Sequence, residues 1–174
     1  MRALAIALIA LFTATAAQAD EAMTKAATDF YTATRSAGSG LPDAAARARL
    51  APLMTPALQQ LFASAAATED HFTSTHKNLP PLVEGDIYSS LFEGPTQFSV
   101  GACTGDAAKA TCPIALTYSD KSGITRWTDT LYLASTAGGW KVDDIAYGGN
   151  WDFGNKGKLS DTLRQVAGFA SSGP

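Results

Sequence analysis

The first half of the chain shows the hydrophobic spacing of amphipathic helices. Apolar residues recur every three or four positions within residues 23–34, which predicts a first helix there. The glycine-rich residues 38–40 break this element. Pro42-Asp43 then suits the first turn of a short second helix that runs through Leu50.

Two further helices are predicted from the same periodicity. Thr55 followed by Pro56 is a typical N-cap and first position for a third helix, which should end before Pro80. Its apolar stripe comprises Leu58, Leu61, Phe62, Ala65 and Phe72. A last amphipathic segment, starting near Ser160, predicts a C-terminal helix through its apolar residues Leu159, Leu163, Val166 and Phe169.

The second half of the chain changes to the composition of β-strands. Four segments are rich in β-branched and aromatic residues, and they cover residues 97–103, 111–118, 124–135 and 140–147. Short turn sequences separate them at residues 104–106, 120–123 and 137–139. Three consecutive short turns predict an antiparallel meander of four strands.

Helices followed by a run of strands predict an α+β fold. We expect N-terminal helices packed on a curved, cone-like four-stranded antiparallel sheet, with a C-terminal helix. Residues 82–94 are expected to form an extended connection with a short strand or a turn near residues 86–88. The chain should form one domain over residues 20–170, followed by a frayed tail at 171–174.

The N-terminus has the three parts of a secretory signal peptide. Arg2 supplies a positive charge, an apolar run covers residues 3–12, and the small-residue site Ala17-Gln18-Ala19 precedes Asp20. The apolar run is about half the length that a membrane-spanning helix needs. We therefore expect residues 1–19 to be removed after Ala19 and the mature protein to be periplasmic or secreted.

Charge and composition exclude several kinds of partner. The formal net charge is −3, and it becomes −4 when Arg2 is removed with the signal peptide. A mildly acidic chain without lysine and arginine clusters is not expected to bind nucleic acid or anionic lipid. No second apolar run is long enough for a membrane span in the mature chain.

Cys103 and Cys112 are the only cysteines, and both lie in the expected mature part. An even number of cysteines in an exported protein predicts a disulfide, whereas a metal site needs more ligands at short spacing. His71 and His76 are the only histidines, and on a helix they would lie about 140° apart around its axis. We therefore expect a structural disulfide, no metal site and no cofactor.

The order of elements and three short motifs resemble a known fold. The motifs are residues 85–90 with residues 92–94, the strand sequence 140–145, and the C-terminal helix from Leu159. They resemble a family of exported bacterial domains of unknown function with the nuclear-transport-factor-2-like, or cystatin-like, α+β cone fold. The resemblance implies this fold and a location in the cell envelope, and it implies no activity.

Two carboxylates on apolar strands are the candidate catalytic residues. If the strands alternate regularly, Asp129 shares a face with Trp127, and Asp144 shares a face with Trp140 and Val142. Both acids would then face the inside of the cone, where burial raises the pKa of a carboxyl group. The alternative is a β-bulge that turns Asp143 or Asp144 outward, or an ion pair that makes the acid structural.

Aromatic residues are the candidate ligand-binding residues. They would line or fill the space between helices and sheet, and the candidates are Trp127, Tyr132, Trp140, Tyr147 and Trp151. Phe30 and Tyr31 belong to the same aromatic set. In the glycine-rich loop 148–157, Trp151 and Phe153 could be exposed contacts or could seal the cone.

Three functional hypotheses follow. The first is a non-catalytic envelope domain that binds a small apolar ligand or another exported protein. The second is an enzyme of the cone-fold type with Asp129 or Asp144 as general acid or base. The third is an immunity or inhibitor protein whose determinants lie in the exposed loops 104–111 or 148–157.

Overall fold

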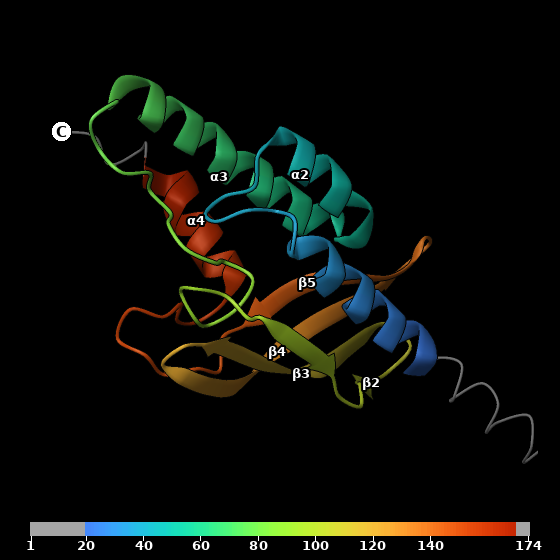
Figure 1. Cartoon of the computed structure of the whole chain (residues 1–174). Coiled ribbons are helices and arrows are strands. Elements are labelled where there is room, and N and C mark those ends of the chain that lie inside the picture. Colours follow the sequence, from blue (N-terminus) through green and yellow to red (C-terminus); the bar gives the residue numbers. More distant parts are fainter. Residues whose placement is uncertain (1–19, 170–174) are drawn as a thin grey trace, which may run out of the picture.

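The structure is a computed structural model, and it describes residues 20–169. Within this range the chain has the predicted α+β fold: four helices pack on a twisted antiparallel sheet that does not close into a barrel (Figure 1). The expected signal peptide at residues 1–19 and the expected frayed tail at 171–174 lie outside the described residues.

Capping residues precede two of the four helices, and the first helix includes residues 20–22 in addition to the expected 23–34. The helices cover residues 20–34, Ala44–Leu50 (α2), Pro56–Thr75 (α3) and Leu159–Phe169 (α4). The side chain of Thr55 accepts a hydrogen bond from the backbone N–H of Leu58 and caps α3. Asp43 caps α2 in the same way, so this helix begins one residue after Asp43 and not at Pro42. A 3₁₀ turn at Ala51–Leu53 (η1) follows α2.

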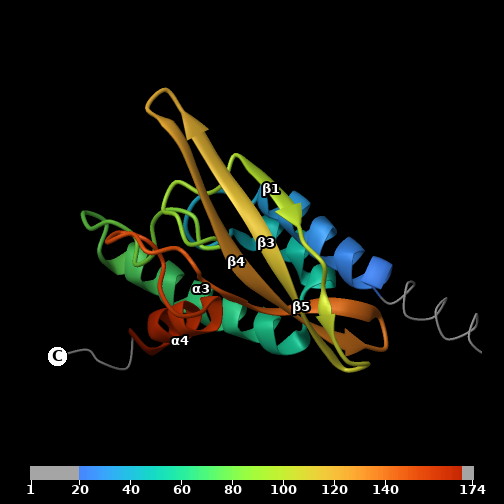
Figure 2. The same cartoon turned by 90° about the horizontal axis from the view of Figure 1, so that it is seen from below.

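The sheet is the predicted meander with one added short strand (Figure 2). Its strands are Gln97–Val100 (β1), Thr104–Gly105 (β2), Lys109–Asp120 (β3), Gly123–Thr136 (β4) and Gly139–Ala146 (β5). The order is β1-β3-β4-β5, and β2 also pairs with β3. The first strand is shorter than expected because its pairing with β3 stops at Val100. The chain then pairs again with the beginning of β3 as the separate short strand β2.

A β-bulge interrupts the pairing of β4 with β5. Tyr132 lies opposite Asp144, and the next residue, Leu133, lies opposite Val142, which leaves Asp143 without a counterpart. The extra residue reverses the alternation, so that Val142 and Ile145 are both buried against the helices. The expectation that Asp144 shares a face with Val142 is therefore wrong, and the bulged alternative is confirmed.

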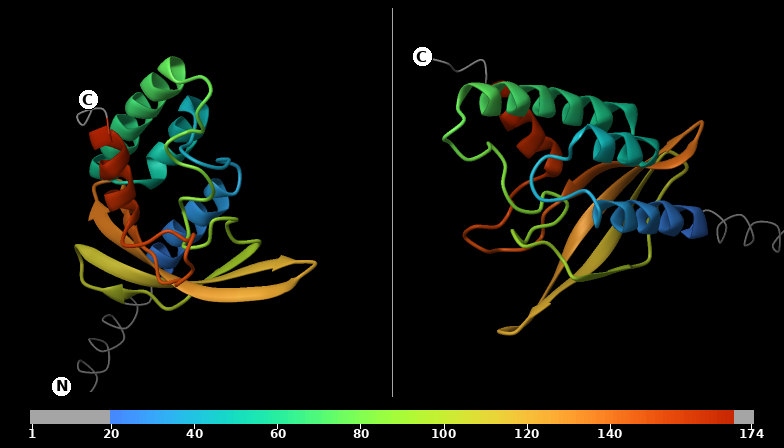
Figure 3. Two further views of the ribbon diagram at one scale, coloured as in Figure 1. Left: turned by 90° about the vertical axis from the view of Figure 1, so that its left-hand side faces the viewer. Right: turned by 45° about the horizontal axis from the view of Figure 1, so that its top comes forward.

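The space between helices and sheet is filled by large side chains. All helices lie on one side of the sheet, as the left view of Figure 3 shows. The largest fully buried side chains include Tyr31, Tyr88, Phe30 and Phe62. They pack on the inward face of β3 and β4, where every second residue is buried. The space between the helices and the sheet is therefore a packed core.

The predicted disulfide is present. Cys103 is bonded to Cys112, which joins the segment before β2 to the neighbouring strand β3. The described residues contain no free cysteine.

The connection from α3 to β1 contains no strand within the described residues. Turns lie at residues 77–78 and 92–93, and the chain bends at residues 87–91, so that no short strand forms near residues 86–88. Although irregular, residues 87–90 are fully buried or nearly so. Their position next to β4 and the N-terminal helix determines where the candidate site lies.

Candidate functional site

The loop of residues 85–94 is irregular in structure, and side chains from distant elements satisfy its buried backbone. The hydroxyl of Tyr31 donates to the carbonyl oxygen of Tyr88 at 3.2 Å, and the hydroxyl of Tyr147 donates to that of Ile87 at 2.7 Å. The side-chain amide of Asn155 donates to the carbonyl oxygens of Asp86 and Ser89, each at 2.7 Å. Because a buried backbone without partners is costly, these bonds give the loop one conformation.

Asp129 connects this loop to the sheet through several hydrogen bonds. It is fully buried and faces inward from β4. Its carboxylate accepts hydrogen bonds from the Ser90 backbone N–H at 2.8 Å, the Ser90 hydroxyl, the Gly148 N–H at 2.8 Å and the Trp127 indole at 3.2 Å. Four donors occupy the acceptor positions of a carboxylate. Asp129 therefore joins two loops and a strand.

Gly148 can approach Asp129 because it lacks a side chain. A Cβ atom at this position would lie 2.1 Å from the carbonyl oxygen of Thr128. Only glycine lets the chain pass this close to β4. The glycine at the start of the loop after β5 thus allows the hydrogen bond from the Gly148 N–H to Asp129.

Asp144, the second candidate acid, lies on the outer side of the sheet. Its carboxylate accepts hydrogen bonds from the Ser160 backbone N–H at 3.0 Å and the Ser160 hydroxyl at 2.7 Å. Ser160 lies in the first turn of α4, where a carboxylate is favoured by unpaired N–H groups. Asp144 also borders an open groove with Tyr132 and Lys158. The structure thus brings Asp129 and Asp144 to opposite faces.

The five candidate aromatic residues do not form one pocket. Trp127 and Trp151 pack edge to face, with ring centres 5.3 Å apart. Tyr132 lies on the outer side, 4.3 Å below the Lys158 ammonium group. Tyr147 holds Ile87 in the loop, and Trp140 is half-buried beside the turn between β4 and β5.

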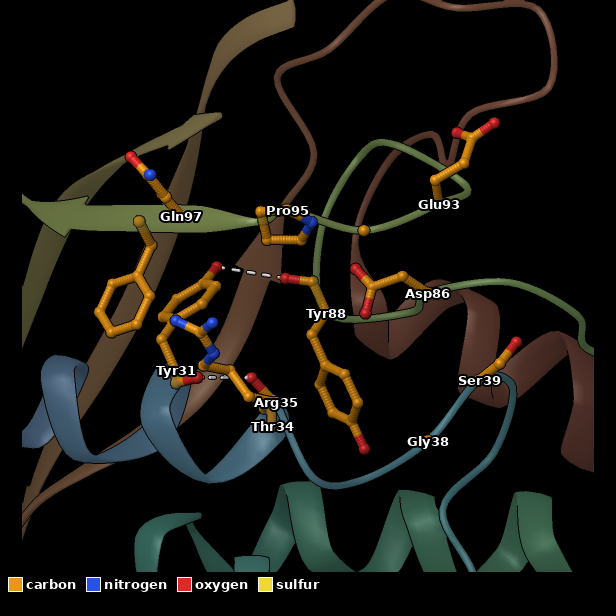
Figure 4. Close-up of a pocket in the computed structure, with 12 residues that line it drawn as sticks. Tyr31, Thr34, Arg35, Gly38, Ser39, Asp86, Tyr88, Glu93, Pro95 and Gln97 are labelled. Atoms are coloured by element: carbon orange, nitrogen blue, oxygen red, sulfur yellow. Dashed lines mark hydrogen bonds between the residues drawn. The ribbon is translucent and has the colours of Figure 1, made fainter. Parts of the chain in front are cut away.

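A cleft opens between the end of the N-terminal helix and the chain from Asp86 to Phe98 (Figure 4). Its volume is about 230 Å³. Tyr31, Tyr88 and Phe98 line it with aromatic rings, and Arg35 and Asp86 bring opposite charges to it. We call this the Asp86 cleft. Gly94 has a positive φ of 73°, and a Cβ atom there would lie 3.0 Å from the Asp86 Cβ, so glycine keeps this wall open.

The environment of the cleft raises the pKa of Asp86. Burial raises the pKa of its carboxyl group to about 6, against partial compensation by hydrogen bonds from the Ser89 hydroxyl and from the backbone of Tyr88 and Ser89. The Ser89 hydroxyl donates to Asp86 Oδ2 at 2.6 Å. Asp86 makes no ion pair within residues 20–169. Its carboxyl group therefore changes protonation state near pH 6.

Two further polar groups of the cleft lack partners. The Tyr88 hydroxyl is buried and has no hydrogen-bond partner within the described part of the chain. Figure 4 shows its ring reaching from the loop toward the segment that carries Gly38. Burial, followed by the charge of Asp86, raises the pKa of Tyr88. The exposed guanidinium of Arg35 makes no ion pair with the described residues.

A second surface lies on the other side of residue 93. It consists of Leu91, Phe92, Trp151 and Phe153, and we call it the aromatic surface. The side chain of Phe153 is 91 % exposed and that of Phe92 is 45 % exposed. Trp151 is half-buried against Trp127. In loop 148–157, Trp151 thus partly seals the interior, whereas the side chain of Phe153 is exposed.

The sequence pattern did not identify Asp86 and Arg35 as site residues. Asp86 and Ser89 have the spacing at which a carboxylate accepts hydrogen bonds within its own turn, and this signal predicts a turn only. The cleft arises because the N-terminal helix packs against a loop more than fifty residues away in sequence. Local patterns contain no information on such a distant pairing.

The chain was compared with protein-family models, with curated proteins and with solved structures, and none of these comparisons finds a match. No helix in the part of the chain that the structure describes is long and apolar enough to cross a membrane. His71 and His76 are both exposed at the end of α3. Among residues 20–169, no cluster of three or more histidine, cysteine or acidic side chains could hold a metal ion.

Proposed function

We propose that this protein is an exported, non-catalytic domain that binds a small ligand in the Asp86 cleft. The observation that carries the proposal is a half-buried carboxylate that lines a cleft without an ion-pair partner in the described chain. Keeping such a group costs free energy, because burial disfavours the charged form. Perturbed carboxylates in clefts are typical of functional sites.

The size of the cleft supports a small ligand. A volume of about 230 Å³ is below the range of sites that bind drug-sized molecules. The walls combine aromatic rings with Arg35 and Asp86, so a ligand with polar groups suits them better than a purely apolar one. The Ser89 hydroxyl, which donates to Asp86, is fully buried and therefore holds the carboxylate in place within its turn.

The proposed location outside the cytoplasm has two supports. The sequence of residues 1–19 has the organisation of a signal peptide. The Cys103–Cys112 disulfide suits an oxidising compartment. We therefore infer that the domain works in the periplasm or after secretion, where small solutes reach the cleft directly.

A chemical-shift titration tests the proposed function. The oxidised domain is titrated by NMR with a panel of small polar and apolar compounds, and we expect shifts at residues 31–39 and 85–98. Ser39→Trp should fill the cleft and abolish these shifts, because Ser39 lines the cleft and is exposed. Ser36→Trp is the matched control, because Ser36 is exposed in the same connection and does not line the cleft. If no compound shifts these residues, the proposed function is wrong.

A second candidate function is binding of another exported protein through the aromatic surface. The 91 % exposure of Phe153 favours it, because an exposed phenylalanine beside a second exposed ring is typical of interaction sites. The exposed carboxylates of Glu93 and Asp152 flank this surface. The partner should therefore present an apolar side chain next to basic groups.

Photo-crosslinking tests this second function. A photoreactive residue at position 153 should crosslink one partner in cells, whereas the same residue at exposed position 124 on the β3–β4 hairpin should not. The purified partner should then bind the wild type at least ten-fold more tightly than Phe153→Ser and equally tightly as Ile124→Ser. Equal affinity for all three proteins would exclude this surface.

A further inference from the structure

We propose that the ligand of the Asp86 cleft is a small zwitterion whose ammonium group binds Asp86 and whose carboxylate binds Arg35. This inference rests on the proposed function, because it names the ligand class of the same site. It depends on the placement of two opposite charges around one small volume, neither of which has an ion-pair partner in the described chain.

Asp86 has acceptor capacity that its own turn does not use. A carboxylate offers about four acceptor positions, and the Ser89 hydroxyl and the backbone N–H groups of Tyr88 and Ser89 occupy three of them. Figure 4 shows the carboxylate directed from the loop into the space beside Pro95 and Tyr88. An ammonium group there would donate to the carboxylate and would favour its ionised form.

Arg35 supplies the complementary group at the open side. Its guanidinium is exposed at the end of the N-terminal helix and carries five N–H donors in a fixed planar arrangement. A ligand carboxylate could bind it with two parallel hydrogen bonds. The exposed position means that this contact needs little desolvation of the protein.

Because the cleft contains both positive and negative side chains, it disfavours ligands that carry a single charge. A simple cation in the cleft would meet Arg35, and a simple anion would meet Asp86 and the carboxylate of Glu93 at the rim. A zwitterion satisfies both groups and stays neutral overall. Its aliphatic part would contact the aromatic wall of the cleft at Tyr31 and Phe98, whose ring centroids lie 5.4 Å apart.

Three matched sets of compounds test the ligand class by NMR titration at pH 7. The first set contains unbranched ω-amino acids of two to five carbons, and the other two contain the amines and the carboxylates of equal length. We expect one amino acid to bind at least ten-fold more tightly than its matching amine and carboxylate. Its chain length then reports the distance between the two charged groups.

Two variants assign the charges, and a third is the control. Asp86→Asn should reduce affinity for the amino acid to that for the matching carboxylate, and Arg35→Gln should reduce it to that for the matching amine. Arg126→Gln removes an exposed guanidinium on β4, away from the cleft, and should leave affinity unchanged. Equal losses in all three variants would overturn the assignment, because they would show a general charge effect.

The pH dependence gives an independent readout. Arg35, Glu93, Tyr31 and Tyr88 are the other charged or titratable groups of the cleft. Burial raises the pKa of Tyr31 and of Tyr88 above the ordinary tyrosine value, and it raises the pKa of Asp86 to about 6. Affinity for the amino acid should therefore fall several-fold from pH 7 to pH 5 in the wild type and stay constant in Asp86→Asn. If other compounds shift the cleft residues and no zwitterion is preferred, this inference is wrong and the proposed function stands. If no compound of either panel shifts them, both are wrong.

Discussion

Asp129 and Asp86 both accept hydrogen bonds from residues of the loop 85–94, but they differ in burial and in the number of donors around them. Asp129 is fully buried and receives hydrogen bonds from three separate segments. Asp86 belongs to the loop itself and faces a cleft. A carboxylate whose acceptor positions are filled by the protein is a structural element, whereas one with unused positions next to a cleft is available to a ligand.

Replacing Asp129 by alanine should destabilise the protein by about 3–5 kcal/mol, because the buried N–H groups of Ser90 and Gly148 lose their acceptor. Urea unfolding measures the loss. The control is Asp152→Ala in the loop of residues 148–157. Because this side chain is exposed, its removal should change the free energy of unfolding by less than about 0.5 kcal/mol. A loss at Asp129 as small as at Asp152 would contradict the tethering role.

Asp86 should make stability depend on pH. Its folded pKa of about 6 lies above the ordinary value of 3.8, so the folded state holds this proton over a window in which the unfolded state has released it. Stability that is present below pH 4 is therefore lost as pH rises through 6. The free energy of unfolding of the wild type, measured relative to Asp86→Asn, should fall by about 2 kcal/mol from pH 4 to pH 7. A constant difference between the two proteins would show that burial does not perturb Asp86.

At the scale of elements, the β-bulge in β5 determines how α4 is attached to the sheet. The bulge turns Asp144 outward, and this places its carboxylate at the first turn of α4. Further contacts hold the other end of α4, where the Thr68 hydroxyl of α3 donates to the carbonyl oxygen of Ala167. The sheet and α3 thus fix both ends of the C-terminal helix.

Asp144→Ala should lower the free energy of unfolding by about 1–2 kcal/mol, because the N–H and the hydroxyl of Ser160 lose their acceptor. Hydrogen exchange should speed up first at the amides of residues 160–163. Asp161→Ala removes an exposed carboxylate from the same turn, and its pair with Arg164 should contribute less than about 0.5 kcal/mol. Equal exchange rates in the two variants would argue against capping by Asp144.

At the scale of the whole molecule, the filled interior restricts where function can lie. Aromatic and aliphatic side chains occupy the space between helices and sheet, so the Asp86 cleft and the aromatic surface both lie at its edge. The same loop of residues 85–94 borders both sites. The Cys103–Cys112 bond lies elsewhere, at the end of the sheet formed by β2 and β3.

Removing the disulfide should therefore lower stability without altering the cleft. The chain-entropy estimate for a loop closed over a sequence separation of 9 is about 2–3 kcal/mol. The Cys103→Ser, Cys112→Ser double variant should show this loss in urea unfolding and should keep the ligand-induced shifts of residues 85–98. Loss of these shifts in a folded double variant would indicate that the disulfide shapes the cleft.

Local sequence patterns were enough to predict the α+β class, most helix and strand boundaries and the disulfide. Each depends on local information: Thr55 caps the helix that follows it, and the turns at 120–123 and 137–139 join neighbouring strands. Hydrophobic periodicity likewise placed Asp129 on the inward face, since β4 alternates regularly up to the bulge.

The partners of the polar side chains depend on long-range packing, which local patterns do not contain. The bulge that turns Asp144 outward depends on pairing between two strands, and periodicity within one strand cannot reveal it. The four donors around Asp129 come from segments up to 39 residues away in sequence. Arg35 and Asp86 meet around one cleft only because the N-terminal helix packs against a loop whose conformation other elements impose. Because hydrogen-bond partners and clefts arise from long-range packing, local sequence specifies the helices and strands of this protein, and the packing of these elements specifies the Asp86 cleft.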